Sequence, residues 1–468
     1  MKRVAVVLGV LAVAGLALGQ TVERVSLSSA GEQGNDGSGS VSLTSDGRYV
    51  AFGSVATNLV PVDTNGHRDI FVRDRVTGQT DRVSVDGSGA ELPGISNQPC
   101  ISGDGRYVAY NHYNPADTAQ KKIHIYDRQT GAMDTVGIFS SHNQYHSPKL
   151  SDDGRYLVYM RAWEECGMSG CVWHYEAVWL DRQTSAGISI PCIGADISGD
   201  GRYVVYMTMG DGLYRYDTQT AEVVDCGSGY NMVVNRDGRY IAFTTHLQLD
   251  AADTDALPDV YRKDLQTDEV VLCSVQEGIR RAEYASIGPD GRYVGYKLGL
   301  TGQPYPPYFF DTQTGENACL IMPLWGGGVE GSYALPAFCD DPNLMGFAAV
   351  EGTLILGDTN GEKDVFVCDL SGPQCVGLDD GWNLLGYLRE YHEPTLLADC
   401  EIDDGSSVMS WDDAVGVGLV QAMLYCYEEG VGYTSLATSG DDDDHFRSGC
   451  GYWLLNESGA ELILRIPW

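Results

Sequence analysis

A phrase that recurs at intervals of about 50 residues limits the folds open to this chain. Its clearest copy, Cys100–Met133, contains two apolar runs, each next to a polar turn. The first turn reads Asp-Gly-Arg-Tyr, and the second reads Asp-x-x-Thr-Gly or a variant of it. The Asp of the first turn recurs at Asp46, Asp104, Asp153, Asp200, Asp237 and Asp290, with a decayed seventh copy at Asp340. Several short strands in each repeat of this length predict a β-propeller.

Each repeat is expected to form one four-stranded blade. In the copy quoted above, the four strands are predicted at residues 100–102, 107–111, 122–126 and 133–136. Both polar turns then lie on the same face of the ring, the lower face. We therefore predict an all-β fold, with a seven-bladed β-propeller of four-stranded blades. Six or eight blades are the alternatives.

The positions of the two turns also predict an ion pair within each blade. Arg106 opens the second strand beside the place where the third strand ends at Asp127. Arg48 and Asp74 occupy the same positions in the first repeat. A bidentate contact between guanidinium and carboxylate explains both residue types, so we assign these residues to structure and not to catalysis.

The phrase Ile101–Tyr110, followed by Tyr126–Gly131, resembles the repeat of TolB-type β-propellers. Copies of it extend over about residues 21–378. Propellers of this kind are mostly platforms that bind proteins or ligands, and some form the non-catalytic half of hydrolases. The resemblance therefore implies a fold more strongly than an activity.

The two ends of the chain differ from the repeats. Lys2 and Arg3 precede the apolar run Val4–Leu18, which predicts a signal peptide of residues 1–19 and a secreted or periplasmic protein. The propeller is expected over residues 20–378, and a β-rich module over residues 379–468. Glu23–Leu27 matches the fourth strand of the first repeat, so we expect it to complete the last blade, although Cys375–Leu378 competes for that place.

Charge and cysteine content narrow the possible partners. The net charge is -35 at pH 7, from 65 acidic and 30 basic residues. This charge repels phosphate backbones and anionic lipid, so neither nucleic acid binding nor membrane insertion is expected. Thirteen cysteines in an exported chain predict disulfides. We expect the bridge Cys166–Cys171; Cys368 with Cys375, and a bridge among Cys400, Cys426 and Cys450, are further possibilities.

The long loops of the upper face are the expected ligand site, because loops on a rigid scaffold carry function. The candidate ligand-binding residues are His112, Tyr113, His142, Tyr145, His146, Trp163 and His246. Among these, His142 and His146 could hold a metal ion. Sugar lyases that resemble TolB-type propellers use a histidine-bound cation on a propeller face, and the resemblance implies that alternative here.

Calcium is a second possible ligand of the upper loops. One pattern places oxygen-bearing side chains at its first, third and seventh positions, as a loop around Ca²⁺ does. It occurs as Asp63, Asn65 and Asp69, as Asp253, Asp255 and Asp259, and as Asp358, Asn360 and Asp364. The Glu that completes an EF-hand loop is missing. An Asx-stabilised turn is the alternative explanation.

Common catalytic signatures are missing from the sequence, including Gly-x-Ser-x-Gly and His-Glu-x-x-His. The sequence therefore favours an exported, non-catalytic propeller that binds a protein or glycan partner through its upper loops. The alternatives are a metal-dependent polysaccharide lyase or hydrolase, and a structural protein of the envelope or matrix.

Overall fold

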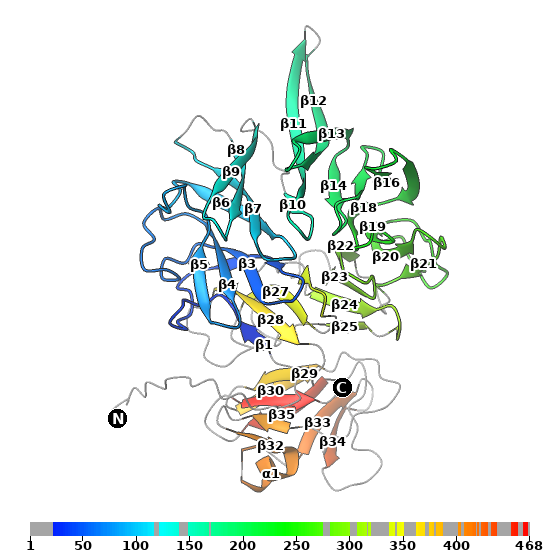
Figure 1. Cartoon of the computed structure of the whole chain (residues 1–468). Coiled ribbons are helices and arrows are strands. Elements are labelled where there is room, and N and C mark those ends of the chain that lie inside the picture. The colour runs from blue at the N-terminus through cyan, green and yellow to red at the C-terminus, as the bar shows by residue number, and fades with distance from the viewer. Residues whose placement is uncertain are drawn as a thin grey trace.

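The computed structural model (Figure 1) describes residues 22–116, 121–139, 148–167, 170–274, 281–299, 307–315, 317–319, 337–341, 344–350, 362–369, 374–378, 381–386, 401–403, 407–417, 419–420, 423–428, 432–437, 451–456 and 462–466. The expected signal peptide lies outside these residues. Within them, no helix has the length and apolar character needed to cross a membrane.

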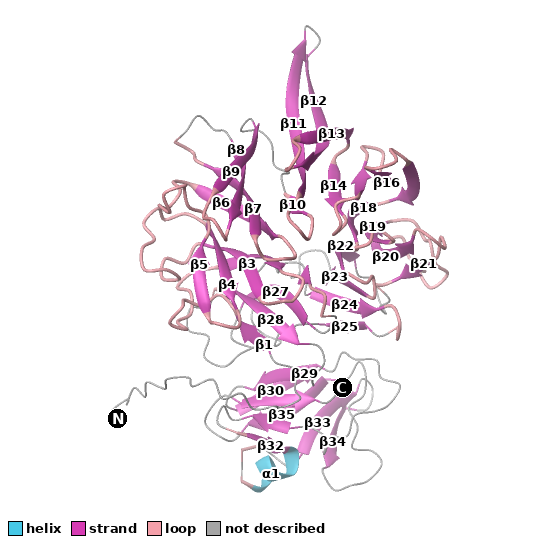
Figure 2. Cartoon of the chain, viewed as in Figure 1, coloured by secondary structure: helices cyan, strands magenta, loops and turns pink. Residues whose placement is uncertain are grey.

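Seven four-stranded antiparallel sheets form a ring (Figures 1 and 2). The prediction of an all-β, seven-bladed β-propeller is confirmed. In the first three blades, the strands from the centre outward are β2 (Ser38–Leu43), β3 (Tyr49–Ser54), β4 (Asp69–Asp74) and β5 (Gln79–Arg82); β6 (Ile95–Ile101), β7 (Tyr107–Tyr113), β8 (Lys121–Asp127) and β9 (Met133–Phe139); and β10 (Lys149–Leu150), β11 (Tyr156–Gly167), β12 (Gly170–Asp181) and β13 (Ala186–Pro191).

The next three blades follow the same order. They consist of β14 (Gly194–Ile197), β15 (Tyr203–Met207), β16 (Gly212–Asp217) and β17 (Val223–Ser228); β18 (Tyr230–Val234), β19 (Tyr240–Thr245), β20 (Asp259–Asp264) and β21 (Val270–Leu272); and β22 (Arg281–Ile287), β23 (Tyr293–Gly299), β24 (Pro307–Asp311) and β25 (Asn317–Cys319). Blades are numbered 1 to 7 in this order. Each predicted strand of blade 2 is present. Three of them contain the whole expected range, whereas β6 begins earlier than expected and ends at Ile101, one residue before the expected end.

Blade 7 joins the two ends of the propeller. It contains β26 (Ala337–Phe338), β27 (Leu344–Val350) and β28 (Lys363–Asp369), and its outer strand is β1 (Val22–Arg24). Val22 pairs with Cys368, and Arg24 pairs with Phe366. The predicted closure of the ring by the N-terminal strand is therefore confirmed.

The predicted ion pair between the two lower turns is present in six blades. Both carboxylate oxygens of Asp127 accept hydrogen bonds from Arg106, and the guanidinium lowers the pKa of Asp127 to about 2. The closest N–O distances are Arg48–Asp74 2.7 Å, Arg106–Asp127 2.8 Å, Arg155–Asp181 2.7 Å, Arg202–Asp217 2.6 Å, Arg239–Asp264 2.6 Å and Arg292–Asp311 2.5 Å. These pairs tie the second strand of a blade to its third.

The glycine of the lower turn also links neighbouring blades. Gly201 has a φ of +75°, which favours glycine, and a Cβ there would lie 2.1 Å from the ring of Tyr156 in the preceding blade. Gly154 stands in the same relation to Tyr107, at 2.3 Å. Each Asp-Gly-Arg-Tyr turn thus supplies the flat surface on which the next turn packs.

Apolar side chains fill the space between adjacent sheets. At the junction of blades 7 and 1, Val50, Phe52 and Phe71 pack with Val365 and Val367, and all five side chains are fully buried. Burying a side chain of this size stabilises the fold by about 1.5–3 kcal/mol. The core is therefore a series of layers between blades around the channel.

The strands β11 and β12 are longer than those of the other blades, and their hairpin projects from the ring in Figure 1. The expected disulfide Cys166–Cys171 closes its far end, with an S–S distance of 2.04 Å. The side chains of Cys375, Cys400, Cys426 and Cys450 lie outside the described residues, so the other bridges stay predictions.

Two further sheets form the C-terminal module. One contains β29 (Gln374–Leu378), β36 (Leu462–Ile466), β31 (Glu401–Asp403) and β32 (Val408–Ser410); the other contains β30 (Gly381–Gly386), β35 (Gly451–Asn456), β33 (Met423–Glu428) and β34 (Gly432–Ala437). The short helix α1 (Trp411–Gly416) follows β32. Because β29 pairs with β36, residues 374–378 belong to this module, and the boundary expected after residue 378 moves before Gln374.

Candidate functional site

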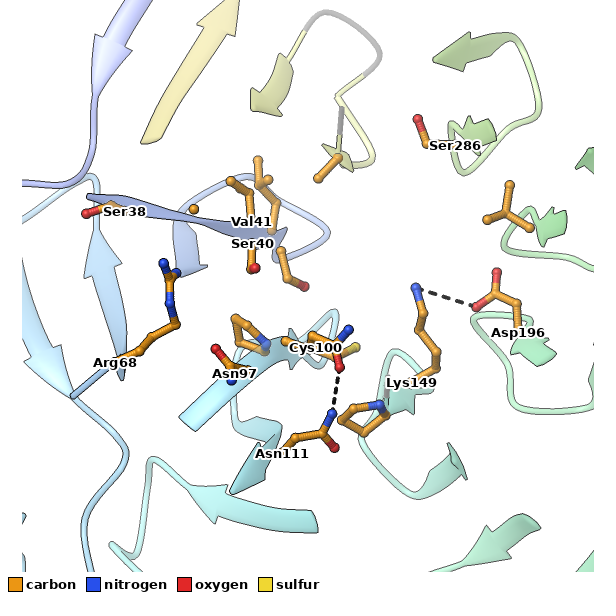
Figure 3. Close-up of a pocket in the computed structure, with 18 of the residues that line it drawn as sticks. Ser38, Ser40, Val41, Arg68, Asn97, Cys100, Asn111, Lys149, Asp196 and Ser286 are labelled. Atoms are coloured by element: carbon orange, nitrogen blue, oxygen red, sulfur yellow. Dashed lines mark hydrogen bonds and ion pairs between the residues drawn. The ribbon is translucent and has the colours of Figure 1, made fainter. Parts of the chain in front are cut away.

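The innermost strands of the blades enclose a channel of about 860 Å³ (Figure 3). Residues of the innermost strands β2, β6, β10, β14, β18, β22 and β26 line it, together with residues of β7, β8, β23 and β28 at its upper end. Hydroxyl and amide groups are frequent in the lining, including Ser40, Ser42, Asn97, Gln98 and Asn111. The cavity is therefore polar and has the size of a ligand site.

The charge of the channel is opposite to that of the chain. Five basic residues and one acidic residue belong to its lining: Arg68, Lys121, Lys149, Lys297, Lys363 and Asp196. The chain as a whole carries a net charge of -35. A basic concentration of this kind in an acidic protein indicates a local site for negative charge.

Three of the basic residues lie on the side of the channel formed by blades 6, 7 and 1. Burial and the neighbouring Lys363 lower the pKa of Lys297 to about 8. Burial and the neighbouring Arg68 lower the pKa of Lys363, and burial lowers the pKa of Arg68. We call Arg68, Lys297 and Lys363 the cationic row. Its members destabilise one another's charged forms, which an incoming anion would relieve.

The opposite side of the channel carries a compensated charge. Lys149 Nζ lies 3.9 Å from Asp196 Oδ1, and this carboxylate raises the pKa of Lys149 (Figure 3). Cys100 lines the channel beside them, and burial raises the pKa of its thiol. The thiol is therefore held in its protonated, weakly nucleophilic form.

The lower end of the channel is closed. Arg236 of blade 5 pairs across the ring with Asp152 of blade 3 and Asp340 of blade 7. Backbone amides also link successive blades here, by Ser45 to Gly103 (3.0 Å), Asp104 to Asp152 (2.9 Å), Asp152 to Gly199 (2.7 Å), Gly199 to Arg236 (2.9 Å), Arg236 to Pro289 (3.2 Å) and Asp340 to Ser45 (2.7 Å). A ligand therefore enters from the upper face.

One link of this amide ring is missing among the described residues. Pro289 of blade 6 has no N–H and cannot donate to blade 7. A cavity of about 240 Å³ lies at this junction, between Pro289 and Tyr293 on one side and Phe338 and Cys339 on the other. In the decayed seventh repeat, Asp340 takes the position of Ser45, one residue away from the expected alignment.

Four innermost strands carry a β-bulge, and two of the bulge residues, Ser40 and Gln98, line the channel. The register shifts at Ser40 in β2, Gln98 in β6, Asn231 in β18 and Tyr284 in β22. Each has a positive φ, of 59°, 54°, 51° and 64° in that order, although none is glycine. Such bulges redirect side chains, and strained backbone collects at functional sites. The bulges therefore support the channel as the functional site.

The structure separates the candidate residues proposed from the sequence. His112 and Tyr113 belong to the channel lining. The His112 imidazole is buried against Ser96 (3.1 Å) and the ring of His124 (5.2 Å), and burial lowers its pKa to about 4. His112 is therefore neutral at physiological pH.

The other candidate residues lie elsewhere. Trp163 lies on the projecting hairpin, 39% exposed, and stacks on His174 at 5.1 Å. His246 contacts Tyr230 of β18, with 5.9 Å between ring centroids. His142, Tyr145 and His146 lie outside the described residues. No potential metal-binding group of three residues in the described ranges contains a histidine.

The first calcium loop already contains a positive side chain. Asp63, Asp69 and Glu91 place their oxygens close together, and Arg82 NH1 lies 3.6, 3.8 and 2.5 Å from them. Asn65 donates a 2.9 Å hydrogen bond to Asp69. The guanidinium supplies the charge that a calcium ion would bring.

The other two calcium loops differ in this respect. In blade 7, Arg24 Nε lies 3.0 Å from Asp364; Asp358 and Asn360 lie outside the described residues. In blade 5, Leu272 occupies the position of Arg82. Leu272 pairs with Tyr261 and Arg82 pairs with Phe71, and each of these partners lies two residues after the last Asp of its loop. There Asp253, Asp255 and Asp259 place carboxylate oxygens within 4.8 Å of one another. The calcium prediction is therefore best kept for blade 5.

Sequence reasoning missed the cationic row. A signal was present, because Arg68 and Lys363 take the same sixth position in two copies of the proposed calcium loop. The calcium pattern assigns no role to this position, because it lies between the positions of the oxygen ligands. Lys297 lies in the second strand of its blade, at the position that Asn111 takes in blade 2. Basic residues at equivalent upper positions in a strongly acidic chain could have indicated the site.

These features define a seven-bladed β-propeller with a closed lower face and a basic upper channel. No family model and no curated protein matches the chain. Solved structures do match it. An oligogalacturonate lyase in complex with manganese is 13% identical, with a TM-score of 0.51 over 76% of this chain and 94% of that chain.

Two further matches are propellers of other proteins. The β-propeller domain of the Trilobed protease from Pyrococcus furiosus is 14% identical (TM-score 0.49; 72% of this chain, 94% of that chain). TolB from Acinetobacter baumannii is 18% identical (TM-score 0.38; 65% and 77%). The fold is consistent with the TolB-type repeat seen in the sequence. At these identities the likeness concerns the fold and not the activity.

Proposed function

We propose that the upper channel binds a narrow organic anion, and that the chain is an exported, non-catalytic propeller whose partner is an acidic glycan. The observation that carries this proposal is the lining of five basic residues and one acidic residue in a chain of net charge -35. Because long-range electrostatics repel anions from such a protein, positive charge inside the channel serves a local contact.

The energetics of the cationic row support a ligand. Three half-buried like charges cost stability, and the lowered pKa of Lys297, to about 8, expresses part of that cost. A carboxylate placed among Arg68, Lys297 and Lys363 would form charge-assisted hydrogen bonds with groups that are already positioned. The protein retains a locally unfavourable arrangement, as binding sites commonly do.

The shape of the site favours a glycan over a protein surface. The charges are recessed in a channel that is closed below, so a flat partner cannot reach them, whereas a narrow chain end can. Ser40, Gln98 and Asn111 offer hydroxyl and amide groups that match the hydroxyls of a sugar. Export is supported by the disulfide Cys166–Cys171, which is typical of oxidising compartments.

Binding is tested by isothermal titration calorimetry with citrate and with a trimer of galacturonic acid, at low and high salt. We expect both acids to bind, more weakly at high salt, and a neutral maltotriose to give no heat. The double variant Lys297→Met, Lys363→Met should lose at least about tenfold in affinity. Lys263→Met is the matched control, because Lys263 pairs with Asp268 (2.9 Å) and does not line the channel.

Three results would contradict the proposal. They are no binding of either acid by the natural chain, equal losses in the channel and control variants, and cleavage of the acid trimer that a chelator abolishes. The last result would favour the metal-dependent lyase. Self-association on a sizing column without ligand binding would favour the structural alternative.

A further inference from the structure

Tyr284 differs in its size from the other three bulge residues of the innermost strands, Ser40, Gln98 and Asn231. Asparagine and small polar residues tolerate a positive φ, but a bulky aromatic residue at φ 64° is uncommon. The surrounding structure must hold Tyr284 in this conformation. Despite this cost, 45% of the side chain is exposed to solvent. The strain therefore serves to present an aromatic ring, not to bury it.

The position of Tyr284 is fixed by comparison with blade 2. Gln98 occupies the same bulge position there, lines the channel and accepts a 2.6 Å hydrogen bond from Asn111. In blade 6 the residue in place of Asn111 is Lys297, and its Nζ lies 5.3 Å from the centroid of the Tyr284 ring. Tyr284 does not belong to the channel lining itself, but its ring lies against Lys297, which does.

This pair recognises more than negative charge. An ammonium group at this distance from an aromatic ring is attracted to its face, which orients both groups. The exposed part of the ring can stack on the C–H face of a sugar, which is apolar and weakly positive. The ammonium can pair with a carboxylate on the same sugar. Citrate, an inorganic anion or an acidic peptide offers the charge without the flat ring.

We propose that Tyr284 and Lys297 form a subsite for one uronic acid residue of an acidic oligosaccharide, with Tyr284 determining the preference for a sugar ring. This inference rests on the proposed function of the channel. It adds the chemical class of the ligand: a pyranose ring that bears a carboxylate. Because the lower mouth is closed, the bound residue belongs to a short chain or a chain end.

The test compares two acids on three proteins. The galacturonic acid trimer and citrate are titrated into the natural chain, Tyr284→Phe and Tyr284→Ala by calorimetry. We expect Tyr284→Ala to weaken trimer binding about tenfold while citrate binding changes less than about twofold. Tyr284→Phe keeps the ring and should retain most of the trimer affinity. Thermal denaturation of each variant establishes that it is folded.

The possible failures are distinct. If the natural chain binds neither acid, the proposed function is wrong and this inference falls with it. If both acids bind and Tyr284→Ala weakens them equally, or weakens neither, the anion site stands and the sugar subsite is refuted. If Tyr284→Ala does not fold, Tyr284→His keeps an aromatic ring and Tyr284→Asn removes it with a residue that tolerates positive φ. Equal trimer affinities in those two variants would also refute the subsite.

Discussion

Replacing Lys297 by methionine removes one charge from the cationic row, and we expect the variant to unfold at a higher temperature than the natural chain. Methionine keeps much of the length and flexibility of the lysine side chain, so the packing changes little. The change removes the repulsion from Lys363 and the cost of holding a buried ammonium group. A substitution that harms ligand binding should therefore stabilise the fold, as is common at functional sites.

The magnitude follows from the pKa of Lys297. The value falls from 10.5 to about 8, and each pKa unit corresponds to about 1.4 kcal/mol, which gives roughly 3.5 kcal/mol as an upper limit. Water in the channel screens part of this, so we expect a gain of about 2 kcal/mol. With an unfolding entropy of about 2 cal/mol/K per residue over about 350 residues, the midpoint should rise by roughly 3 °C.

The sign of the pH dependence is also fixed. Near pH 7, Lys297 is charged in the folded and in the unfolded natural chain, so the full cost is present. Between about pH 8 and 10.5 the folded chain has lost this proton while the unfolded chain keeps it. The natural chain gains stability over this interval, and the advantage of the variant shrinks.

Differential scanning calorimetry near pH 7 and near pH 10 measures both effects. Lys263→Met is the control, because its partner Asp268 makes the loss of charge unfavourable or neutral at either pH. The reasoning is refuted if Lys297→Met is less stable than the natural chain near pH 7. It is also refuted if the gain is the same at both pH values.

Gly201→Ala should lower the free energy of unfolding, measured by chemical denaturation, by about 3 kcal/mol or more, because the new Cβ would lie 2.1 Å from the ring of Tyr156. Gly66→Ala is the control, because Gly66 has a similar φ in open surroundings, and it should cost about 1 kcal/mol. Equal losses in the two variants would disprove the packing role of Gly201. Asp127 has its pKa lowered to about 2 by Arg106, so its stabilisation is complete above about pH 4 and lost as the pH falls through about 2. Acid unfolding followed by circular dichroism should lack this component in Asp127→Asn; an unchanged acid curve would count against the pair. Calcium at about 1 mM should raise the unfolding temperature through the loop of blade 5, and Asp255→Asn should abolish the effect. An absent shift, or one that survives in that variant, would exclude this loop as the calcium site.

Local spacing in the sequence was sufficient for the architecture. The distance from the turn arginine to the turn aspartate, as in Arg106 and Asp127, already implied which strands are neighbours. The likeness of residues 23–27 to the fourth strand of blade 1 identified the strand that closes the ring. These features were predictable because each depends on contacts within one repeat or on a direct copy of one.

The channel was not predictable in the same way. Lys297, Lys363 and Arg68 come from three different blades, and only the closed ring brings their charges together. Arg82 was visible in the sequence, but its contact with Asp63 depends on the pairing of β4 with β5 and on the loop that follows. The strained backbone at Tyr284 leaves no mark in the sequence, because tyrosine is an ordinary strand residue.

The way in which blade 7 closes determines how the ring responds to a pulling force. Val22 pairs with Cys368, so the first residue of β1 lies beside the C-terminal end of β28. Tension applied through the chain before β1 and after β28 therefore separates the two strands from this end, one hydrogen bond at a time. Strands loaded in this way separate at lower force than strands loaded in shear, where all hydrogen bonds are stretched together. Since Pro289 has no N–H to donate to blade 7, we expect this blade to detach first in single-molecule stretching.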